Sequence, residues 1–204
     1  MIVIVDYGLG NVTSVAGAVK KLGLDPVISS RPQDIAQAEK LILPGVGAFG
    51  DGMKNLRGLG LVDLLNVEVI QKKKPILGIC LGAQLMAKDS FEFGHHQGLS
   101  WIDASVVKLD VSAQNLSVPH VGWNDLVQTK ADMLWDSIPA DALFYYVHSF
   151  HIQCRREGII TGACDYGGRF TAAFHQDNIF ATQFHPEKSQ QHGLQVLHNF
   201  LTKA

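Results

Sequence analysis

The sequence lacks an excess of charge of either sign, and it has no long hydrophobic run. Its 17 lysine and arginine residues stand against 19 aspartate and glutamate residues, so the formal net charge is −2. The one short basic run, at residues 72–74, is most simply the solvated end of a helix. Nucleic-acid binding normally shows as a basic patch or stripe, so no nucleic-acid partner is expected. No apolar run approaches the roughly 18 residues of a membrane span, so no membrane attachment is expected either.

Cysteine is also scarce. The three cysteines, Cys80, Cys154 and Cys164, are odd in number and show no C-x-x-C spacing, which argues against a disulfide framework and against a zinc site. The pattern favours a reducing compartment, with the cytoplasm as the default. The segment from Gly8 to Gly10 lacks the third glycine of a dinucleotide-binding fingerprint. We therefore expect neither a metal nor a cofactor.

Short apolar strands alternate with helical patterns in the first half of the chain. Each strand is apolar on both faces, which is typical of a parallel sheet covered by helices on both sides. The length fits a single domain spanning residues 1–204. Asn11 is a candidate N-cap and Gly23 a candidate C-cap of the first helix. Strands are predicted at residues 2–5, 26–30, 40–45 and 75–80, and helices at 11–21 and 50–74, the second weakened near Gly58 and Gly60.

The second half contains short strand-like runs broken by turn sequences such as "DYGG" and "QDN". We expect these runs to form antiparallel hairpins that extend the sheet on one side. A last helix is predicted from a cap at Ser189 to the C-terminus. The fold class is therefore α/β, with a central, mostly parallel sheet. The predicted strands of this half lie at residues 105–109, 117–119, 142–147, 152–154, 159–164, 171–174 and 179–184.

Cys80 stands between Gly78 and Gly82, after a buried strand and before a helix. G-x-C-x-G in that context has the form of a nucleophile elbow, in which a sharp strand-to-helix turn presents the side chain. The helix N-terminus beneath the sulfur would favour the thiolate. The simpler alternative is packing, because free cysteine is among the most buried residue types. We expect Cys80 to be the nucleophile.

A thiolate in acyl chemistry needs a base that can also protonate the leaving group, and histidine is the usual choice. His120 and His148 are well placed, but neither is followed by a carboxylate two residues on. His185 is followed by Pro186 and Glu187. An extended His-Pro-Glu unit would bring the two side chains to one side, so that the carboxylate orients the imidazole. The alternative is a polar turn in which Glu187 stabilises the first turn of the last helix.

Acyl chemistry at Cys80 also requires hydrogen-bond donors for the oxyanion. The backbone N–H of Leu81, directly after the nucleophile, is one natural donor. A second is expected from the loop Gly45, Val46 and Gly47, which follows the neighbouring strand. Its glycines leave the backbone free to present or withhold an N–H. The alternative for this segment is a simple loop between a strand and a helix.

These residues resemble the triad-type (class I) glutamine amidotransferases, and the similarity extends along nearly the whole chain. The segments that carry it are GICLG with Gln84, QFHPE at residues 183–187, and five further segments. Within the family the resemblance is nearest to glutaminase subunits of histidine biosynthesis. Ala83 and Val121 stand where relatives often have methionine, and the loop at residues 89–102 is less familiar, so Glu92 and Gly94 are not assigned to glutamine binding. The further segments are DYGLGN, LPGVGAFGDGM, PHVGWN, FYYVHSF and FHPEKS.

The resemblance implies a reaction and a partner. Cys80 would attack the side-chain amide of glutamine through a γ-glutamyl thioester, and water would then release glutamate. Gln84 and the backbone around His148 and Ser149 would hold the glutamine. Ammonia would pass to a (βα)8-barrel synthase in a heterodimer, where imidazole glycerol phosphate and an aminoimidazole carboxamide ribotide form. The residues implied near that partner or the glutamine are Trp123, Asn124, Tyr145 and Lys188.

Three alternatives stay open at this point. A paralogous glutaminase subunit could serve another acceptor, in nucleotide-sugar or lipopolysaccharide pathways. A γ-glutamyl cysteine hydrolase of similar topology would act on peptides without a partner. A catalytically silent binding subunit would have kept the fold alone, which an intact set of Cys80, His185 and Glu187 argues against.

Overall fold

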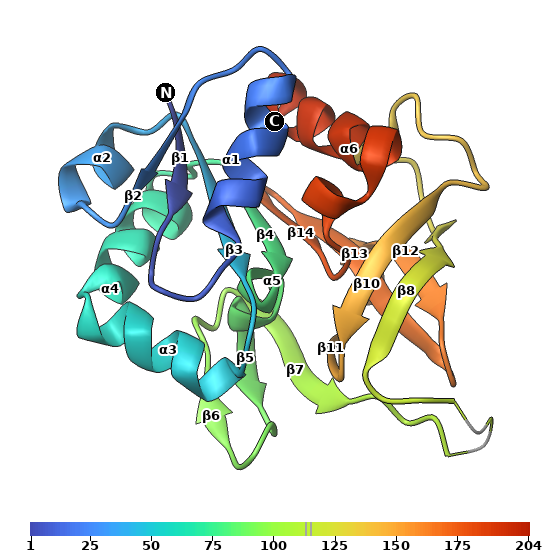
Figure 1. Cartoon of the computed structure of the whole chain (residues 1–204). Coiled ribbons are helices and arrows are strands. Elements are labelled where there is room, and N and C mark those ends of the chain that lie inside the picture. The colour runs from blue at the N-terminus through green and yellow to red at the C-terminus, as the bar shows by residue number, and fades with distance from the viewer. Residues whose placement is uncertain (113, 115) are drawn as a thin grey trace.

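The fold is built on one eight-stranded sheet. Figure 1 shows the computed structural model, which describes residues 1–112, 114 and 116–204. The strand order is β2-β1-β3-β4-β14-β13-β12-β9. The first five strands pair in parallel and the last four in antiparallel fashion, β14 belonging to both groups. The strands are β1 (Ile2–Val5), β2 (Pro26–Ser29), β3 (Lys40–Gly45), β4 (Ile76–Cys80), β9 (Val127–Gln128), β12 (Ile160–Asp165), β13 (Arg169–Gln176) and β14 (Ile179–Thr182).

Helices cover both faces of the parallel part, as the sequence predicts. Alternate side chains of β1 belong to two different hydrophobic core clusters. Ile4 shares one cluster with residues of α1 and α6, whereas Val3 and Val5 share the other with residues of α2, α3 and α4. The predicted long helix at 50–74 is broken, because Gly60 adopts φ +67° between α3 and α4. The helices are α1 (Val12–Lys21), α2 (Pro32–Gln37), α3 (Phe49–Gly58), α4 (Leu61–Leu65), a π-helix (Asn66–Gln71), α5 (Leu81–Leu85) and α6 (Gln190–Lys203).

The second half differs from the prediction in its strand partners. Only β9 and β12–β14 extend the main sheet, whereas the other strands form two small sheets of order β10-β8 and β11-β7-β5-β6. The strand predicted at 117–119 is absent, and pairing begins at His120, after a proline that has no N–H to donate. The small sheets contain β5 (Ala87–Ser90), β6 (His96–Gln97), β7 (Ile102–Lys108), β8 (His120–Asp125), β10 (Leu143–His148) and β11 (Phe150–Cys154).

The three predicted helix caps have different outcomes. Gly23 has φ +77° and its N–H bonds to the carbonyl of Lys20, which confirms the predicted end of α1. Asn11 and Ser189 precede α1 and α6, but neither side chain caps its helix. The short helix α2, which begins at Pro32, was not predicted.

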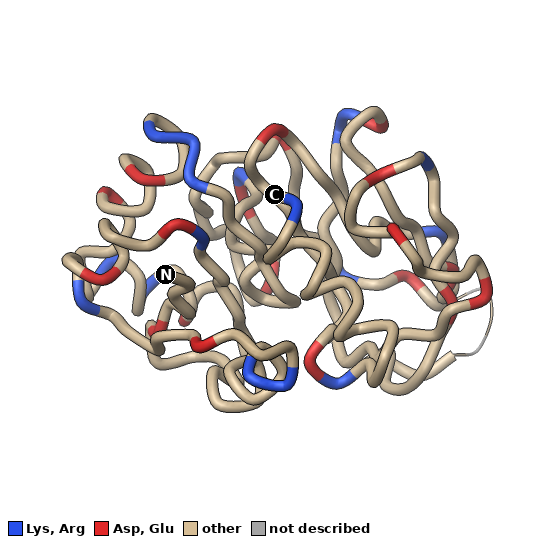
Figure 2. Tube along the Cα trace, turned by 90° about the horizontal axis from the view of Figure 1, so that it is seen from above, with Lys and Arg blue, Asp and Glu red and all other residues tan. Residues whose placement is uncertain are grey.

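Charged residues are spread over the molecule. Figure 2 shows lysine and arginine positions together with aspartate and glutamate positions in both halves of the trace. In the described part of the chain, no helix combines the length and apolarity required to cross a bilayer.

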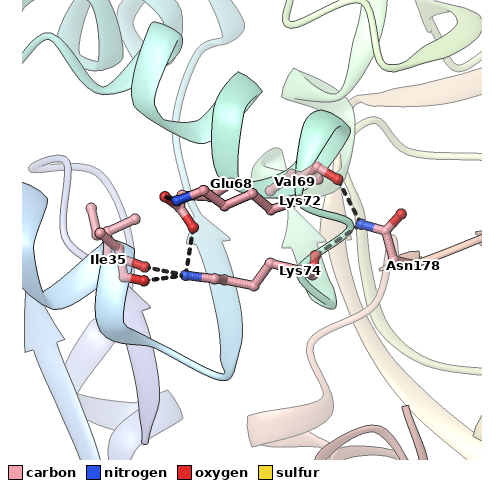
Figure 3. Close-up of polar contacts among 7 residues, drawn as sticks. Ile35, Glu68, Val69, Lys72, Lys74 and Asn178 are labelled. Carbon is pink, nitrogen blue, oxygen red and sulfur yellow. Dashed lines mark hydrogen bonds and ion pairs between the residues drawn. The ribbon is translucent and has the colours of Figure 1, made fainter.

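A buried ion pair ties the π-helix to the start of β4 (Figure 3). The Glu68 carboxylate lies 2.7 Å from the Lys72 ammonium and 2.8 Å from that of Lys74, and the Glu68 side chain is only 2% exposed. Lys74 also donates to the carbonyls of Ile35 and Ala36 at 2.7 and 2.9 Å. Burial would raise the pKa of Glu68, but the two ammonium groups outweigh it and hold the pKa below its usual value. The pair therefore stabilises the fold above the pKa of an unfolded glutamate, and this stabilisation is lost as the pH falls.

We expect Glu68→Gln to lower the free energy of unfolding by roughly 3 kcal/mol at pH 7, because it leaves the buried Lys74 ammonium without a counter-charge. The difference from wild type should shrink toward pH 3.5, which lies below the pKa of an unfolded glutamate, because protonation of the unfolded chain then removes the stabilisation. Urea unfolding at the two pH values measures this. The exposed Glu157→Gln serves as control and should change stability by at most about 0.5 kcal/mol. An equal loss at both pH values would contradict the assignment.

Candidate active site

Cys80 ends β4 in a strained turn. Its φ of 53° and ψ of −111° are unusual for a residue with a side chain, and α5 begins at the next residue. The turn requires glycine on both sides. A Cβ on Gly82 would collide with the carbonyl oxygen of Leu43, and one on Gly78 would lie 2.8 Å from the Cα of Ala83. The strand–turn–helix context predicted for Cys80 is confirmed.

His185 and Glu187 form a buried pair after β14. Nδ1 of His185 lies 2.8 Å from Oε1 of Glu187, and the two side chains are 2% and 1% exposed. The predicted contact is confirmed, but its predicted backbone is wrong, because Pro186–Lys188 is a 3-10 turn rather than an extended segment. Since Nδ1 donates to the carboxylate, Nε2 is the free ring nitrogen, and it has no hydrogen-bond partner among the described residues.

The charge on His185 is coupled to Cys80. Burial by itself would lower the pKa of His185, but the neighbouring Cys80 sulfur, as the thiolate, and the Glu187 carboxylate outweigh it and raise the pKa to about 10. The imidazolium is thus favoured beside the sulfur at neutral pH. Cys80 and His185, which are 105 positions apart in the sequence, therefore form one electrostatic unit with Glu187.

Ser189 holds the His185 turn against β10. The His185 N–H donates to the carbonyl of Tyr145 at 2.9 Å, and the Tyr145 N–H donates to Oγ of Ser189 at 2.9 Å. Ser189 in turn donates to the carbonyl of His185 at 2.6 Å. The side chain that was predicted to cap a helix instead fixes the histidine.

A pocket of about 360 Å³ opens over the sulfur. It contains several of the predicted site residues, whereas a larger cavity of about 650 Å³, beneath β11–β13, contains none of them. Glu92, which the sequence left unassigned, lies in the wall, and its carboxylate accepts from the N–H of Phe49 at 2.7 Å. The lining residues are Val46, Gly47, Cys80, Leu81, Gln84, Glu92, Val147, His148, Ser149, Phe150 and Lys188.

The predicted oxyanion loop lies beside Cys80. Gly45 pairs in register with Cys80 across β3 and β4, and Gly47 adopts φ +104°, a conformation that favours glycine. A side chain on Gly45 would collide with the hydroxyl of Tyr7. That hydroxyl is buried and has no hydrogen-bond partner among the described residues. Burial, with Cys80 nearby, holds the pKa of Tyr7 far above its usual value, so the hydroxyl stays neutral.

Two buried glutamines lie under the pocket. Gln84 Nε2 donates to the carbonyl of Phe150 at 2.8 Å and to Oε1 of Gln183 at 3.0 Å. Gln183 Nε2 lies 3.6 Å from the sulfur of Cys80. Gln84 was predicted as a site residue, but Gln183 was not. Its place directly before the FHPE segment was the available signal.

His148 lines the pocket, but its imidazole is buried and engaged by other polar groups. Its Nδ1 lies 2.9 Å from the carbonyl of Phe150, and its Nε2 lies 3.1 Å from Nδ1 of His120. Asn124 Nδ2 lies 3.3 Å from Nε2 of His120. Burial lowers the pKa of His120 to about 4 and that of His148 to about 3, so both rings are neutral at pH 7.

The residues predicted near a partner are divided between surface and interior. Trp123 and Tyr145 pair in register across β8 and β10, with ring centroids 6.0 Å apart, and Lys188 lies over the Tyr145 ring. Trp123 is 44% exposed. Asn124, however, turns inward, since its amide also donates to the carbonyl of Asp165 at 3.2 Å.

The chain belongs to the class-I glutamine amidotransferase family, whose model matches residues 3–204. It is 47% identical over 200 residues to the imidazole glycerol phosphate synthase subunit HisH 1 of Campylobacter jejuni subsp. jejuni serotype O:23/36 (strain 81-176), with 98% of each chain covered. It is 44% identical over 201 residues to the subunit named HisH 2 of Pseudomonas aeruginosa, again with 98% of each chain covered.

Solved structures share the fold at low sequence identity. A putative GMP synthase protein from Thermoplasma acidophilum matches with a TM-score of 0.72 and 22% identity, over 98% of this chain and 91% of the other. PurLQS from Thermotoga maritima matches with a TM-score of 0.72 and 16% identity, over 98% and 96%. The predicted α/β class with a mostly parallel sheet is confirmed.

We expect Gly82→Ala to lower the free energy of unfolding by at least about 2 kcal/mol, because its Cβ has no room against the Leu43 backbone. Gly17→Ala, in the interior of α1 with nothing within 4 Å of the new Cβ, is the matched control. It should leave stability unchanged or raise it by up to about 1 kcal/mol. Urea unfolding measures both, and equal effects would argue against a close-packed elbow.

Proposed function

We propose that this chain is a glutaminase that hydrolyses glutamine to glutamate and ammonia, as the amidotransferase subunit of imidazole glycerol phosphate synthase. The observation that carries the proposal is that Cys80, which lines the pocket, is coupled to the buried His185–Glu187 pair, so that the imidazolium of His185 is favoured beside the sulfur. Membership of the class-I glutamine amidotransferases supports the reaction, and the full-length similarity to HisH subunits supports the pathway.

The proposed chemistry begins with the Cys80 thiolate. The sulfur attacks the side-chain amide carbon of glutamine, and a C–S bond forms as the amide nitrogen is expelled. His185 donates its proton to that nitrogen, which leaves as ammonia. Water then attacks the γ-glutamyl thioester while His185 takes its proton, the C–S bond breaks, and glutamate leaves. Glu187 holds Nδ1 of His185 throughout, so that Nε2 faces the reacting atoms.

Glutamine binding is assigned to Gln84 and to the backbone of His148 and Ser149, which line the pocket. Both amide hydrogens of Gln84 are already used, by the carbonyl of Phe150 and by Gln183. Only its oxygen is available to a ligand, so Gln84 accepts from an N–H of the substrate. The backbone around His148 remains for the other polar groups of the substrate, because its imidazole is engaged with Phe150 and His120.

Oxyanion stabilisation is assigned to the Leu81 N–H and to an N–H of the loop Gly45, Val46 and Gly47. Supporting this, Leu81, Val46 and Gly47 line the pocket with Cys80, and Gly45 lies opposite Cys80 in the sheet. We propose that the loop is the switch of the enzyme. Its donor is misaimed at rest and is reoriented when the partner and its acceptor bind. Free hydrolysis would otherwise waste glutamine.

The proposed partner is a (βα)8-barrel synthase subunit in a heterodimer. The exposed Trp123, with Tyr145 and Lys188 beside it, is the proposed contact surface, and it adjoins the pocket through Lys188. Asn124 is proposed to act through its inward contacts with His120 and Asp165. The cytoplasm is the proposed compartment, since all three cysteines are unpaired.

A diazo-ketone analogue of glutamine should add one covalent mass to the chain, and Cys80→Ala should abolish the addition. Intact-mass spectrometry measures this, with Cys164→Ala as the matched control that keeps full labelling. Burial raises the pKa of Cys154 to about 11 and that of Cys164 to about 12, so neither competes at neutral pH. Labelling of either in place of Cys80 would refute the assignment of the nucleophile.

Glutamine turnover should rise at least tenfold when the synthase partner and its acceptor are added, because the loop donor is aimed only in the complex. Steady-state release of glutamate, with and without the copurified partner from the same host, measures the effect. An isolated chain already at full speed would rule out the switch. Turnover of γ-glutamyl peptides without a partner would favour the hydrolase alternative, and copurification with a synthase of another pathway would favour another acceptor.

A further inference from the structure

Val147 and Gln183 make polar contacts with the sulfur of Cys80. The carbonyl of Val147 lies 3.9 Å away and can only accept, so it favours the protonated thiol. Gln183 Nε2 lies 3.6 Å away and donates, so it favours the thiolate. Gln183 is 2% exposed, so it lies inside the protein rather than at the surface.

The direction of the Gln183 amide follows from its neighbours. A main-chain carbonyl cannot donate, so the group of Gln84 that faces the oxygen of Phe150 must be its NH2. The same NH2 faces Gln183 at 3.0 Å, so the atom of Gln183 on that side must be the oxygen. The NH2 of Gln183 is thereby turned toward Cys80. Hydrogen-bond valence therefore fixes the orientation of both amides.

The carbonyl of Phe150, which begins this series of hydrogen bonds, is itself held by a hydrogen bond. Nδ1 of His148 donates to it at 2.9 Å, which makes Nε2 of His148 an acceptor for His120 at 3.1 Å. His120 in turn accepts from Asn124 through its other nitrogen. Because both imidazoles are neutral, each bond has one direction only. The line of donors runs from Asn124 on β8 to the Phe150 carbonyl, which also receives Gln84.

We propose that Gln183 is a positioning residue that donates a hydrogen bond to the Cys80 thiolate and aims it into the pocket. The inference rests on the proposed glutaminase function for its consequence, but the contact itself does not depend on it. Gln183 acts on the nucleophile from within the protein, on a side that substrate does not occupy. Gln84 has two roles. Its side-chain oxygen is available to a ligand in the pocket, and its NH2 donates to the oxygen of Gln183 and so fixes the orientation of the Gln183 amide.

The test is Gln183→Met, which keeps the length of the side chain and removes the donor. The midpoint of the pH–rate profile for iodoacetamide alkylation of Cys80 should rise by about one pH unit, a tenfold change in the ionisation constant or about 1.4 kcal/mol. The kcat for glutamine should fall about tenfold, with KM changed less than threefold. The exposed Gln153→Met is the matched control and should change neither quantity.

An unshifted alkylation midpoint in a folded Gln183→Met protein would overturn the inference, whatever happens to turnover. Absence of glutamine turnover in wild type loaded with the synthase partner and its acceptor, with the midpoint shift present, would instead overturn the proposed function and leave the inference standing. Should Gln183→Met fail to fold, the side-chain NH2 resonances of Gln183 in the 15N-labelled wild-type chain give a second readout. They should move as the thiol ionises, and no movement would contradict the hydrogen bond.

Discussion

The parallel ladder of β3, β4 and β14 is the constraint on which the site depends. Gly45 and Cys80 lie in register where β3 and β4 end, and β14 runs beside β4 toward Gln183 and His185. Carboxyl ends of parallel strands share one edge of a sheet, so residues from three distant segments meet there. The close approach of Gly82 to the Leu43 backbone holds the elbow against that edge. Without this contact, the sulfur could not keep its place relative to the imidazole.

Much of the fold and the site could be predicted from sequence because the signals are local. The parallel strands are continuous apolar runs, Cys80 has glycines at fixed spacing, and His185 has a carboxylate two residues on. The features that the sequence did not predict depend on contacts between segments that are far apart in the sequence. β8 pairs with β10 rather than with the main sheet, because the packing of distant segments determines the partners of these strands. The role of Ser189 depends on its hydrogen bond with Tyr145, which is 44 residues away. Gln183 follows an apolar strand, and only the fold shows that its amide faces the sulfur.

Three buried histidines near Cys80 differ in charge because their neighbours differ. Burial keeps His120 and His148 neutral, whereas the Cys80 and Glu187 charges overcome burial at His185. The same residue type is therefore held neutral at two positions and favoured as the cation at a third. The difference is set by which neighbours carry charge.

The main sheet ends in short strands on both sides. β2 has four residues and starts with a proline, and β9 has only two. Exposed strand edges are templates on which other chains can add, and short edges offer few free backbone groups for such pairing. The central sheet, apolar on both faces, is thus protected against edge-to-edge aggregation.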